Sequence, residues 1–208
     1  MQITKIERAL KNKPLYHLYA EDLLLMTVKE ETLLHFRLQK GMDVSDVFLQ
    51  EIHTFDQLQR CLEQAYRFLS RRGHFQKELQ RKLKVKGYDP EIINKALQHL
   101  EDKGYLNDVQ LMVQFVQDAI HLKSYGPNLI KSKLFERGLP DSAIDQALEE
   151  NYPPELQRQV CQELASKKWA SLKKSAKPNI RQKLVAFLQQ RGFTWETIQP
   201  IVEDLTTD

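Results

Sequence analysis

Residues 83–100 read LKVKGYDPEIINKALQHL. The stretch joins two helical segments, with Gly87 after the first and Asp89-Pro90 before the second. Glycine readily takes the left-handed conformation that ends a helix, aspartate is a favoured N-cap, and proline is tolerated at the first helical position. Residues 134–151, LFERGLPDSAIDQALEEN, show nearly the same pattern. The sequence therefore predicts a helical joint that the chain uses more than once.

Alignment on this glycine shows three copies of the joint. The glycines are Gly87, Gly138 and Gly192, which are 51 and then 54 residues apart. Apolar side chains recur eight and four residues before the glycine, directly after it, and six and ten residues after it. In chain order they are Leu79, Leu83, Tyr88, Ile93 and Leu97, then Ile130, Leu134, Leu139, Ile144 and Leu148, then Leu184, Leu188, Phe193, Ile198 and Val202. Such fixed spacing indicates a threefold internal repeat.

A further amphipathic segment precedes each joint. These segments span residues 55–72, 107–123 and 154–174. In the second of them Asn107 is followed three positions later by Gln110, which is similar to the capping box that begins many helices. Each copy is therefore expected to contain three helices.

The first 50 residues follow a different pattern. Between Pro14 and Val28, two short runs rich in leucine, tyrosine, valine and methionine flank an Ala-Glu-Asp turn, which predicts a β-hairpin. Residues 29–41 then favour a short helix with Leu33, Leu34 and Leu38 on one face and Gly41 as its end.

The predicted fold class is mainly α. We expect a small N-terminal module with a β-hairpin at residues 1–53, followed by three-helix repeats at 54–104, 105–152 and 153–208. Because repeats in series contact mainly their neighbours, we expect an elongated, curved array. Arrays of this kind present extended binding surfaces, which favours an interaction protein over an enzyme.

Composition excludes several classes of protein. The chain has 208 residues, 41% hydrophobic and 28% charged, with a formal net charge of +3. No apolar run approaches the roughly 18 residues of a transmembrane helix, and the N-terminus lacks the apolar stretch of a signal peptide. Cys61 and Cys161 are isolated at helical positions, as expected in a reducing compartment. We expect a cytoplasmic monomer that does not bind membranes.

The motifs of common catalytic and cofactor sites are missing. The six histidines form no i, i+4 pair and have no cysteine pair nearby, which argues against a zinc site. None of the seven glycines has the spacing of a phosphate-binding loop. We therefore expect no catalytic residues, no metal ion and no cofactor.

Positive charge gathers in particular stretches. No aspartate or glutamate lies between Glu163 and Glu196, although that segment contains eight lysines and arginines. Trp169 lies among them and could stack on a base, but a helical tryptophan is more often part of a core. A second basic stretch runs from Arg67 to Lys86. Clustered cations attract polyanions even when the total charge is small. The candidate partner-binding residues are Arg67, Arg71, Arg72, Arg81, Lys82, Lys86, Lys123, Lys131, Lys133, Arg137, Lys167, Lys168, Lys173, Lys174, Lys177, Arg181, Lys183 and Arg191.

Two stretches of the chain resemble the RecX family, the regulators of the RecA recombinase. They are FLSRRGHFQKELQRKLKVKGYDPEIINKALQHLEDKGYLND at residues 68–108 and YGPNLIKSKLFERGLPDSAIDQAL at residues 125–148. With the third repeat the likeness spans about residues 55–205, and the N-terminal module resembles the extension of family members from Gram-positive bacteria. The resemblance implies three tandem three-helix units that lie in the groove of a RecA filament on single-stranded DNA. From there the protein would restrain filament extension, ATP hydrolysis and strand exchange.

The chain departs from the family pattern in two places. Relatives commonly have Arg-Ser-Glu where this chain reads Gly-His-Phe-Gln at residues 73–76. The helix after GYLND is often rich in arginine, whereas here it contains Gln114, Gln117 and Asp118. We therefore expect the lysines of the third repeat to carry more of the partner binding.

A winged-helix transcription factor is the alternative. KALQHLEDKGYL, at residues 95–106, is similar to the end of a recognition helix that leads into a wing. A wing requires a short hairpin after Leu106, whereas Asn107 begins a new amphipathic segment. The sequence favours the regulator.

Overall fold

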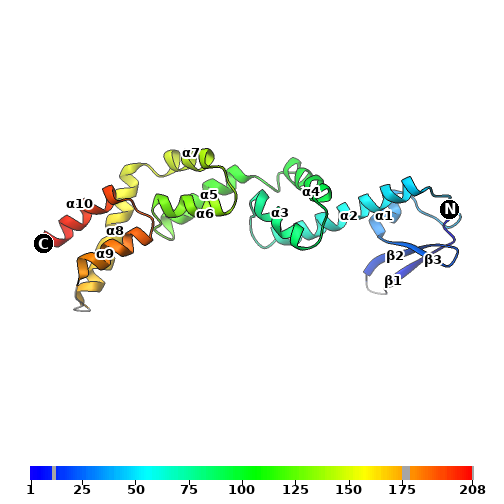
Figure 1. The fold of residues 1–208 in the computed structure, drawn as a ribbon, viewed down its shortest axis with the longest axis horizontal. Helices are drawn as coiled ribbons and strands as arrows, with labels where there is room; N and C mark the ends of the chain where they lie inside the picture. Colours follow the sequence, from blue (N-terminus) through cyan, green and yellow to red (C-terminus); the bar gives the residue numbers. More distant parts are fainter. Residues whose placement is uncertain (11–12, 175–178, 208) are drawn as a thin grey trace. The chain divides into compact units, whose positions relative to one another are not determined.

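The structure is a computed structural model that describes residues 1–10, 13–174 and 179–207. The chain divides into two compact units. One comprises Met1–His74 with Leu79–Leu106, and the other comprises Phe75–Glu78 with Asn107–Asp208. The elements are β1 (Lys5–Leu10), β2 (Lys13–Ala20), β3 (Leu23–Lys29), α1 (Glu30–His35), α2 (Asp46–Leu69), α3 (Gln76–Val85), α4 (Pro90–Asp102), α5 (Asp108–His121), α6 (Pro127–Glu136), α7 (Asp141–Asn151), α8 (Pro154–Lys174), α9 (Ile180–Gln190) and α10 (Trp195–Thr207) (Figure 1).

The N-terminal module is built on a three-stranded antiparallel sheet in the order β1-β2-β3. Strands β2 and β3 form the predicted hairpin, and Glu21 in its turn has a positive φ of 54°. The sequence did not reveal β1, because KIERAL is made mostly of good helix formers. Pairing with β2 overrides that preference, and the Tyr19 hydroxyl donates a hydrogen bond of 2.9 Å to Glu7 across the two strands.

The helix that follows the sheet is shorter than predicted. Helix α1 ends at His35, and Arg37, with a φ of 49°, supplies the left-handed residue that we expected at Gly41. The amide of Leu38 donates to the carbonyl of Leu33 across this turn. As a result Leu38 is buried, while Leu34 is 66% exposed and leaves the predicted apolar face.

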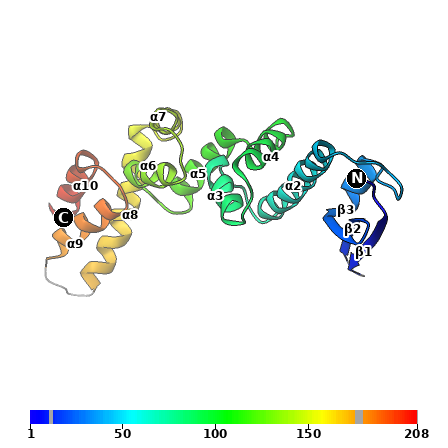
Figure 2. The same ribbon diagram turned by 45° about the vertical axis from the view of Figure 1, so that its right-hand side comes forward.

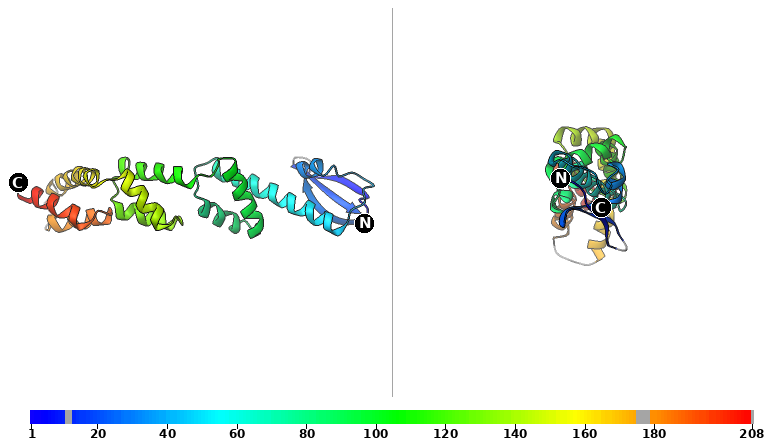
Figure 3. Two further views of the ribbon diagram at one scale, coloured as in Figure 1. Left: turned by 90° about the horizontal axis from the view of Figure 1, so that it is seen from above. Right: turned by 90° about the vertical axis from the view of Figure 1, so that its right-hand side faces the viewer.

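Helix α2 begins nine residues earlier than the predicted start at Phe55. Its N-cap is Ser45, whose hydroxyl accepts a hydrogen bond of 3.1 Å from the amide of Phe48. The first turns of α2 pack on the sheet, where Ile52 is fully buried in a core with Ile3, Leu18, Val28, Leu38 and Val44. The left view of Figure 3 shows the three strands beside the start of this helix. One continuous helix therefore belongs to both the N-terminal module and the first repeat.

A buried carboxylate joins the sheet to α2. Asp56 is 3% exposed, and its Oδ1 accepts hydrogen bonds from the amide of Lys29 (2.7 Å) and the hydroxyl of Thr32 (2.8 Å). Its Oδ2 accepts from Arg60 Nε at 2.5 Å, and Arg60 Nη2 donates to the carbonyl of Thr27 at 3.1 Å. The end of β3, the start of α1 and the middle of α2 therefore share one hydrogen-bond network.

The three predicted repeats are present, and each has three helices. Helices α2, α3 and α4 form the first, α5, α6 and α7 the second, and α8, α9 and α10 the third. Figure 2 shows α8, α9 and α10 packed together at the C-terminal end. Each repeat has its own apolar cluster, to which the aligned positions on either side of the glycine contribute. Trp169 packs against the third cluster, in agreement with the expectation that it is a core residue.

All three joints have the predicted glycine geometry. Gly87, Gly138 and Gly192 have φ values of 88°, 89° and 87°. In each joint the amide after the glycine donates to the carbonyl five residues back, and the glycine amide donates to the carbonyl three residues back. This pair of bonds is the Schellman motif, which satisfies carbonyls at a helix end. Pro90 occupies the first turn of α4 as expected, but the side chain of Asp89 makes no capping hydrogen bond.

The segment after Leu106 is helical. Asn107 is the N-cap of α5, and its side chain accepts a hydrogen bond of 2.9 Å from the amide of Gln110, as predicted. A winged helix would require a hairpin here, so the structure removes the feature on which the alternative depends. Among the residues that the structure describes, no helix is long and apolar enough to span a membrane.

Candidate protein and nucleic-acid interface

The predicted cations are distributed over all three repeats. The first repeat carries Arg67 at the end of α2, Arg71 and Arg72 after it, Arg81 and Lys82 on α3, and Lys86 directly after α3. The second carries Lys123 after α5, Lys131 and Lys133 on α6, and Arg137 directly after α6. The third carries Lys167, Lys168, Lys173 and Lys174 on α8, Arg181 and Lys183 on α9, and Arg191 after it. Lys177 lies outside the described residues.

Arg67 and Lys131 are engaged by carboxylates. Arg67 forms an ion pair with Glu63 one helical turn earlier on α2. Lys131 lies 2.7 Å from Asp145 Oδ1 and 2.9 Å from its Oδ2, and this hydrogen bond raises the pKa of the lysine. Both pairs are exposed, and such pairs contribute little to stability. They do reduce the charge that each cation offers to a polyanion, so Arg67 and Lys131 are the weaker candidates.

Among the described residues of the second and third repeats, six other candidate cations lie over aromatic rings, and five of them lie over Phe115, Tyr125 or Phe187. Arg137 lies over Phe115 at 4.6 Å from the ring centre, and Lys168 lies over Phe187 at 4.8 Å. Three more surround Tyr125, namely Lys123 at 5.9 Å, Lys133 at 5.7 Å and Arg191 at 5.9 Å. The structure therefore brings together predicted site residues that are far apart in the sequence.

Sequence reasoning missed the rings of this group. Phe115 lies on α5, is half-buried and packs on the core of the second repeat. Tyr125 and Phe187 are also half-buried against their repeats. Each ring therefore packs on its own repeat and carries at least one cation, which periodicity alone does not reveal.

The first repeat has a smaller group of the same kind. Lys82 lies over the ring of Phe68 at 5.2 Å from its centre. The Phe68 ring also makes an edge contact with His74, with 6.2 Å between the ring centres. His74 is buried beside this group. It belongs to residues 73–76, where the sequence departs from the family pattern.

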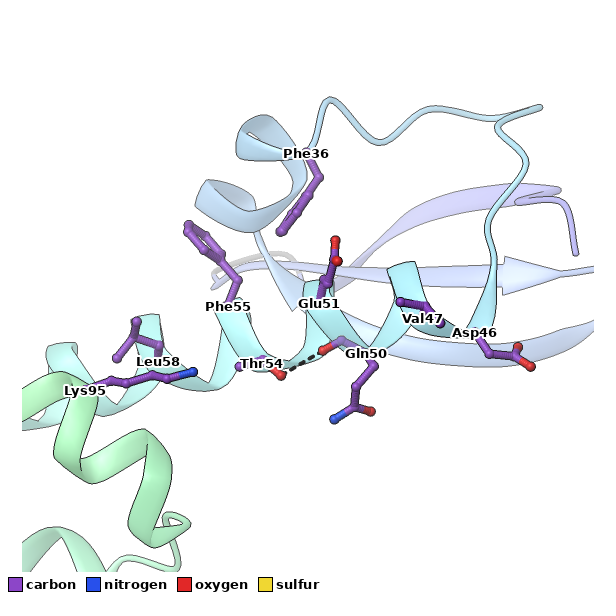
Figure 4. A pocket seen from close by; sticks show the side chains of 9 residues that line it. All are labelled: Phe36, Asp46, Val47, Gln50, Glu51, Thr54, Phe55, Leu58 and Lys95. Carbon is purple, nitrogen blue, oxygen red and sulfur yellow. Dashed lines mark hydrogen bonds between the residues drawn. The ribbon is translucent and has the colours of Figure 1, made fainter.

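An open apolar hollow of about 700 Å³ lies beside α2 in the first unit. Phe36, Val47, Phe55 and Leu58 provide its apolar lining. Figure 4 shows Lys95 reaching from α4 alongside Leu58. The charged residues of the rim are Asp46, Glu51 and Lys95, which include both signs. Gln50 and Thr54 complete the lining.

The two thiols are unsuited to nucleophilic chemistry. Cys61 and Cys161 are fully buried, and burial raises the pKa of Cys61 to about 11 and that of Cys161 to about 12. The thiolate is the reactive form of cysteine, so both side chains are inert near neutral pH. Within residues 1–10, 13–174 and 179–207, no group of histidine, cysteine, aspartate and glutamate side chains could hold a metal ion.

Comparison with known proteins agrees with this architecture. Residues 61–100 match the first three-helix domain of RecX, residues 107–148 the second, and residues 155–202 the third. Regulatory protein RecX of Listeria welshimeri is 32% identical over 208 residues, which cover all of this chain and 77% of the relative. Regulatory protein RecX of Streptococcus agalactiae is 28% identical over 205 residues, which cover 99% of this chain and 77% of the relative.

Solved structures are similar as well. A crystal structure of regulatory protein RecX has a TM-score of 0.72 at 27% identity, covering 97% of this chain and 98% of that one. RecX from Lactobacillus salivarius shares the fold with a TM-score of 0.64 at 24% identity, covering 74% of this chain and 99% of the other. The three consecutive domain matches and the full-length relatives confirm the resemblance found in the sequence. The chain belongs to the RecX family of regulatory proteins.

Proposed function

We propose that this protein binds the RecA filament that forms on single-stranded DNA and regulates it. In this proposal it acts mostly as an inhibitor of filament extension, ATP hydrolysis and strand exchange during recombination and repair. The observation that carries the proposal is the uninterrupted series of three RecX domains between residues 61 and 202. The curated relatives that match the whole chain are named as regulatory proteins.

The placement of charge supports such a partner. Each repeat has cations at or near helix ends. A nucleoprotein filament presents both protein and phosphate, and a phosphate backbone is bound through lysine and arginine. We propose that the protein acts as a monomer. Its parts would be an N-terminal module at residues 1–53 and three repeats at residues 54–104, 105–152 and 153–208. The contact residues would come from the 18 candidate cations.

Electron microscopy of filaments tests this proposal. Filaments of the cognate RecA assembled on single-stranded DNA should become shorter when the protein is added below equimolar amounts. A mean filament length that stays the same at equimolar protein would contradict the proposed regulation, while leaving the family assignment intact.

A further inference from the structure

The five ring-bound cations form one connected series. Arg137 lies over Phe115, and its Nη1 donates a hydrogen bond of 2.6 Å to the carbonyl of Lys133. The Lys133 ammonium lies over Tyr125. Arg191 lies between two rings, at 5.9 Å from the centre of Tyr125 and 5.2 Å from that of Phe187. The basic–aromatic ladder, as we name this group, comprises Phe115, Lys123, Tyr125, Lys133, Arg137, Lys168, Phe187 and Arg191.

The ladder crosses a closely packed junction between the second and third repeats. Arg191 Nη1 donates 2.9 Å to the carbonyl of Lys123, and the Arg191 carbonyl accepts 2.7 Å from the amide of Gly126. The amide of Asn128 donates 3.0 Å to the carbonyl of Gly192. These backbone bonds fix the two halves of the ladder against each other within one compact unit.

The next feature of the ladder is its charge. In the part of the chain that the structure describes, none of its five cations forms an ion pair with a carboxylate, unlike Lys131 with Asp145. Contact with a ring face orients a cation but leaves its full charge. The five cations of the ladder can therefore bind an anionic partner.

The rings also prepare the cations for binding. A lysine or arginine that is free in solvent loses side-chain entropy when it grips a ligand, and prior ordering reduces that cost. Phe115, Tyr125 and Phe187 are half-buried against the cores of their repeats and provide fixed platforms for the cations. Arginine planes and aromatic rings also stack on unpaired bases, which an acidic protein surface does not offer.

We propose that the basic–aromatic ladder binds single-stranded nucleic acid. The three lysines contact phosphates, and the guanidinium planes of Arg137 and Arg191 lie against bases. Direct binding of a strand by this protein does not depend on the proposed function. Its place in regulation does rest on that proposal, because there the ladder would face the DNA strand of the RecA filament.

Fluorescence anisotropy with the full chain and a labelled oligothymidylate of about 30 nucleotides tests the ladder. The test variant carries Lys123→Gln, Lys133→Gln and Lys168→Gln, which spare the structural hydrogen bond of Arg191. The control carries Lys40→Gln, Lys95→Gln and Lys103→Gln, three exposed cations outside the predicted set. Both variants lose three positive charges, so a difference in their affinity for the oligonucleotide depends on where the replaced lysines lie. Thermal unfolding by circular dichroism shows whether both are folded.

The test variant should bind about tenfold or more weakly than the control, and the slope of log K against log salt should fall by about 0.7 for each cation removed. An abasic strand of equal length should bind the unaltered protein more weakly than oligothymidylate. Equal affinities of the two variants would overturn the proposal, as would equal binding of oligothymidylate and a polyglutamate of matched charge.

The same variants separate this inference from the proposed function. If the test variant binds the strand normally but no longer shortens RecA filaments, the ladder contacts protein and the nucleic-acid inference is wrong. If it loses strand binding while the unaltered protein leaves RecA filaments unchanged, the ladder inference holds and the proposed function fails.

Discussion

A Cβ atom on Gly192 would lie 2.3 Å from the backbone nitrogen of Leu129. Likewise, a Cβ on Gly126 would lie 2.4 Å from the carbonyl carbon of Gly192. The third joint therefore packs backbone against backbone on the first turn of α6. Only glycine permits this approach, so the repeated residue has two separate tasks. It reverses the chain at all three joints, and at the third joint it also seats one repeat on the preceding one.

Gly126→Ala should destabilise the protein through this contact. Gly126 has an ordinary φ of −78°, so the added methyl group acts by steric overlap. We expect a loss of about 3 kcal/mol in the free energy of unfolding, measured with urea.

Gly87→Ala is the matched control for the steric effect. Gly87 has a φ of 88°, but nothing lies within 4 Å of the place that a Cβ atom would take there. The left-handed conformation alone should cost about 1–2 kcal/mol. If Gly126→Ala cost no more than Gly87→Ala, the close docking of the second and third repeats would be refuted.

Asp56→Ala should weaken the link between the sheet and α2. The substitution leaves the Arg60 side chain, the Lys29 amide and the Thr32 hydroxyl without their common acceptor. Removing one partner of a buried pair typically costs 3–5 kcal/mol, and we expect about 3 kcal/mol because Arg60 retains some contact with water. Chemical denaturation measures the change.

Glu63→Ala provides the comparison, because Glu63 is 44% exposed and its partner Arg67 is 67% exposed, while Lys29 keeps a second carboxylate, Glu31, at 3.5 Å. Its loss should cost less than about 1 kcal/mol. Similar costs for the two substitutions would show that the Asp56 network has no special role.

The buried thiols predict how stability depends on pH. Burial raises the pKa of Cys61 to about 11 and that of Cys161 to about 12, from an ordinary value near 9.0. Below pH 9 the thiols are protonated in both the folded and the unfolded state. Their contribution to the free energy of unfolding is therefore fully present below that pH. As the pH rises from about 9 to 12, the unfolded chain loses protons first and the folded state loses stability.

The double variant Cys61→Ala, Cys161→Ala should reduce this alkaline loss. Urea unfolding between pH 7 and pH 10 compares it with the unaltered chain, since the two curves should diverge only above about pH 9. Tyr152 adds to the effect in both proteins, because burial raises the pKa of its phenol as well. Parallel curves over the whole range would show that the cysteines do not contribute.

Lys173 and Lys174 at the end of α8, together with Lys177, give a further prediction about nucleic acid. Replacing Lys173, Lys174 and Lys177 by glutamine should lower the affinity for single-stranded DNA and flatten its salt dependence. Lys173 and Lys174 are exposed, and Lys173 lies 5.3 Å from the centre of the Trp169 ring. Titration at several salt concentrations measures the slope. An unaltered slope would show that these three lysines do not bind the strand.

Much of the fold could be predicted because its signals are local. Glycine spacing, apolar periodicity and the Asn107 cap identify three repeats of three helices. Two features escaped because longer-range contacts decide them. Strand β1 has the composition of a helix but pairs with β2. The buried face of α2 changes along the helix, since Ile52 packs on the sheet whereas Cys61, Leu62 and Ala65 pack in the first repeat, and this change hides the start of the helix.

The candidate site could be predicted only in part. Clustered lysines and arginines are visible in the sequence, and all that the structure describes lie on or beside the predicted helices. Their partners are not visible, because Lys168 meets Phe187 only after the third repeat has folded, and Arg191 meets Tyr125 only after the second and third repeats have docked. Likewise, nothing in the sequence shows that Lys131 is held by Asp145 while Lys133 is not.

The rate of ATP hydrolysis by the cognate RecA on single-stranded DNA tests the central claim most directly. Added below equimolar amounts, this protein should depress that rate, and the effect should grow as its concentration approaches that of RecA. A rate that remains unchanged at equimolar protein would contradict the proposed regulation.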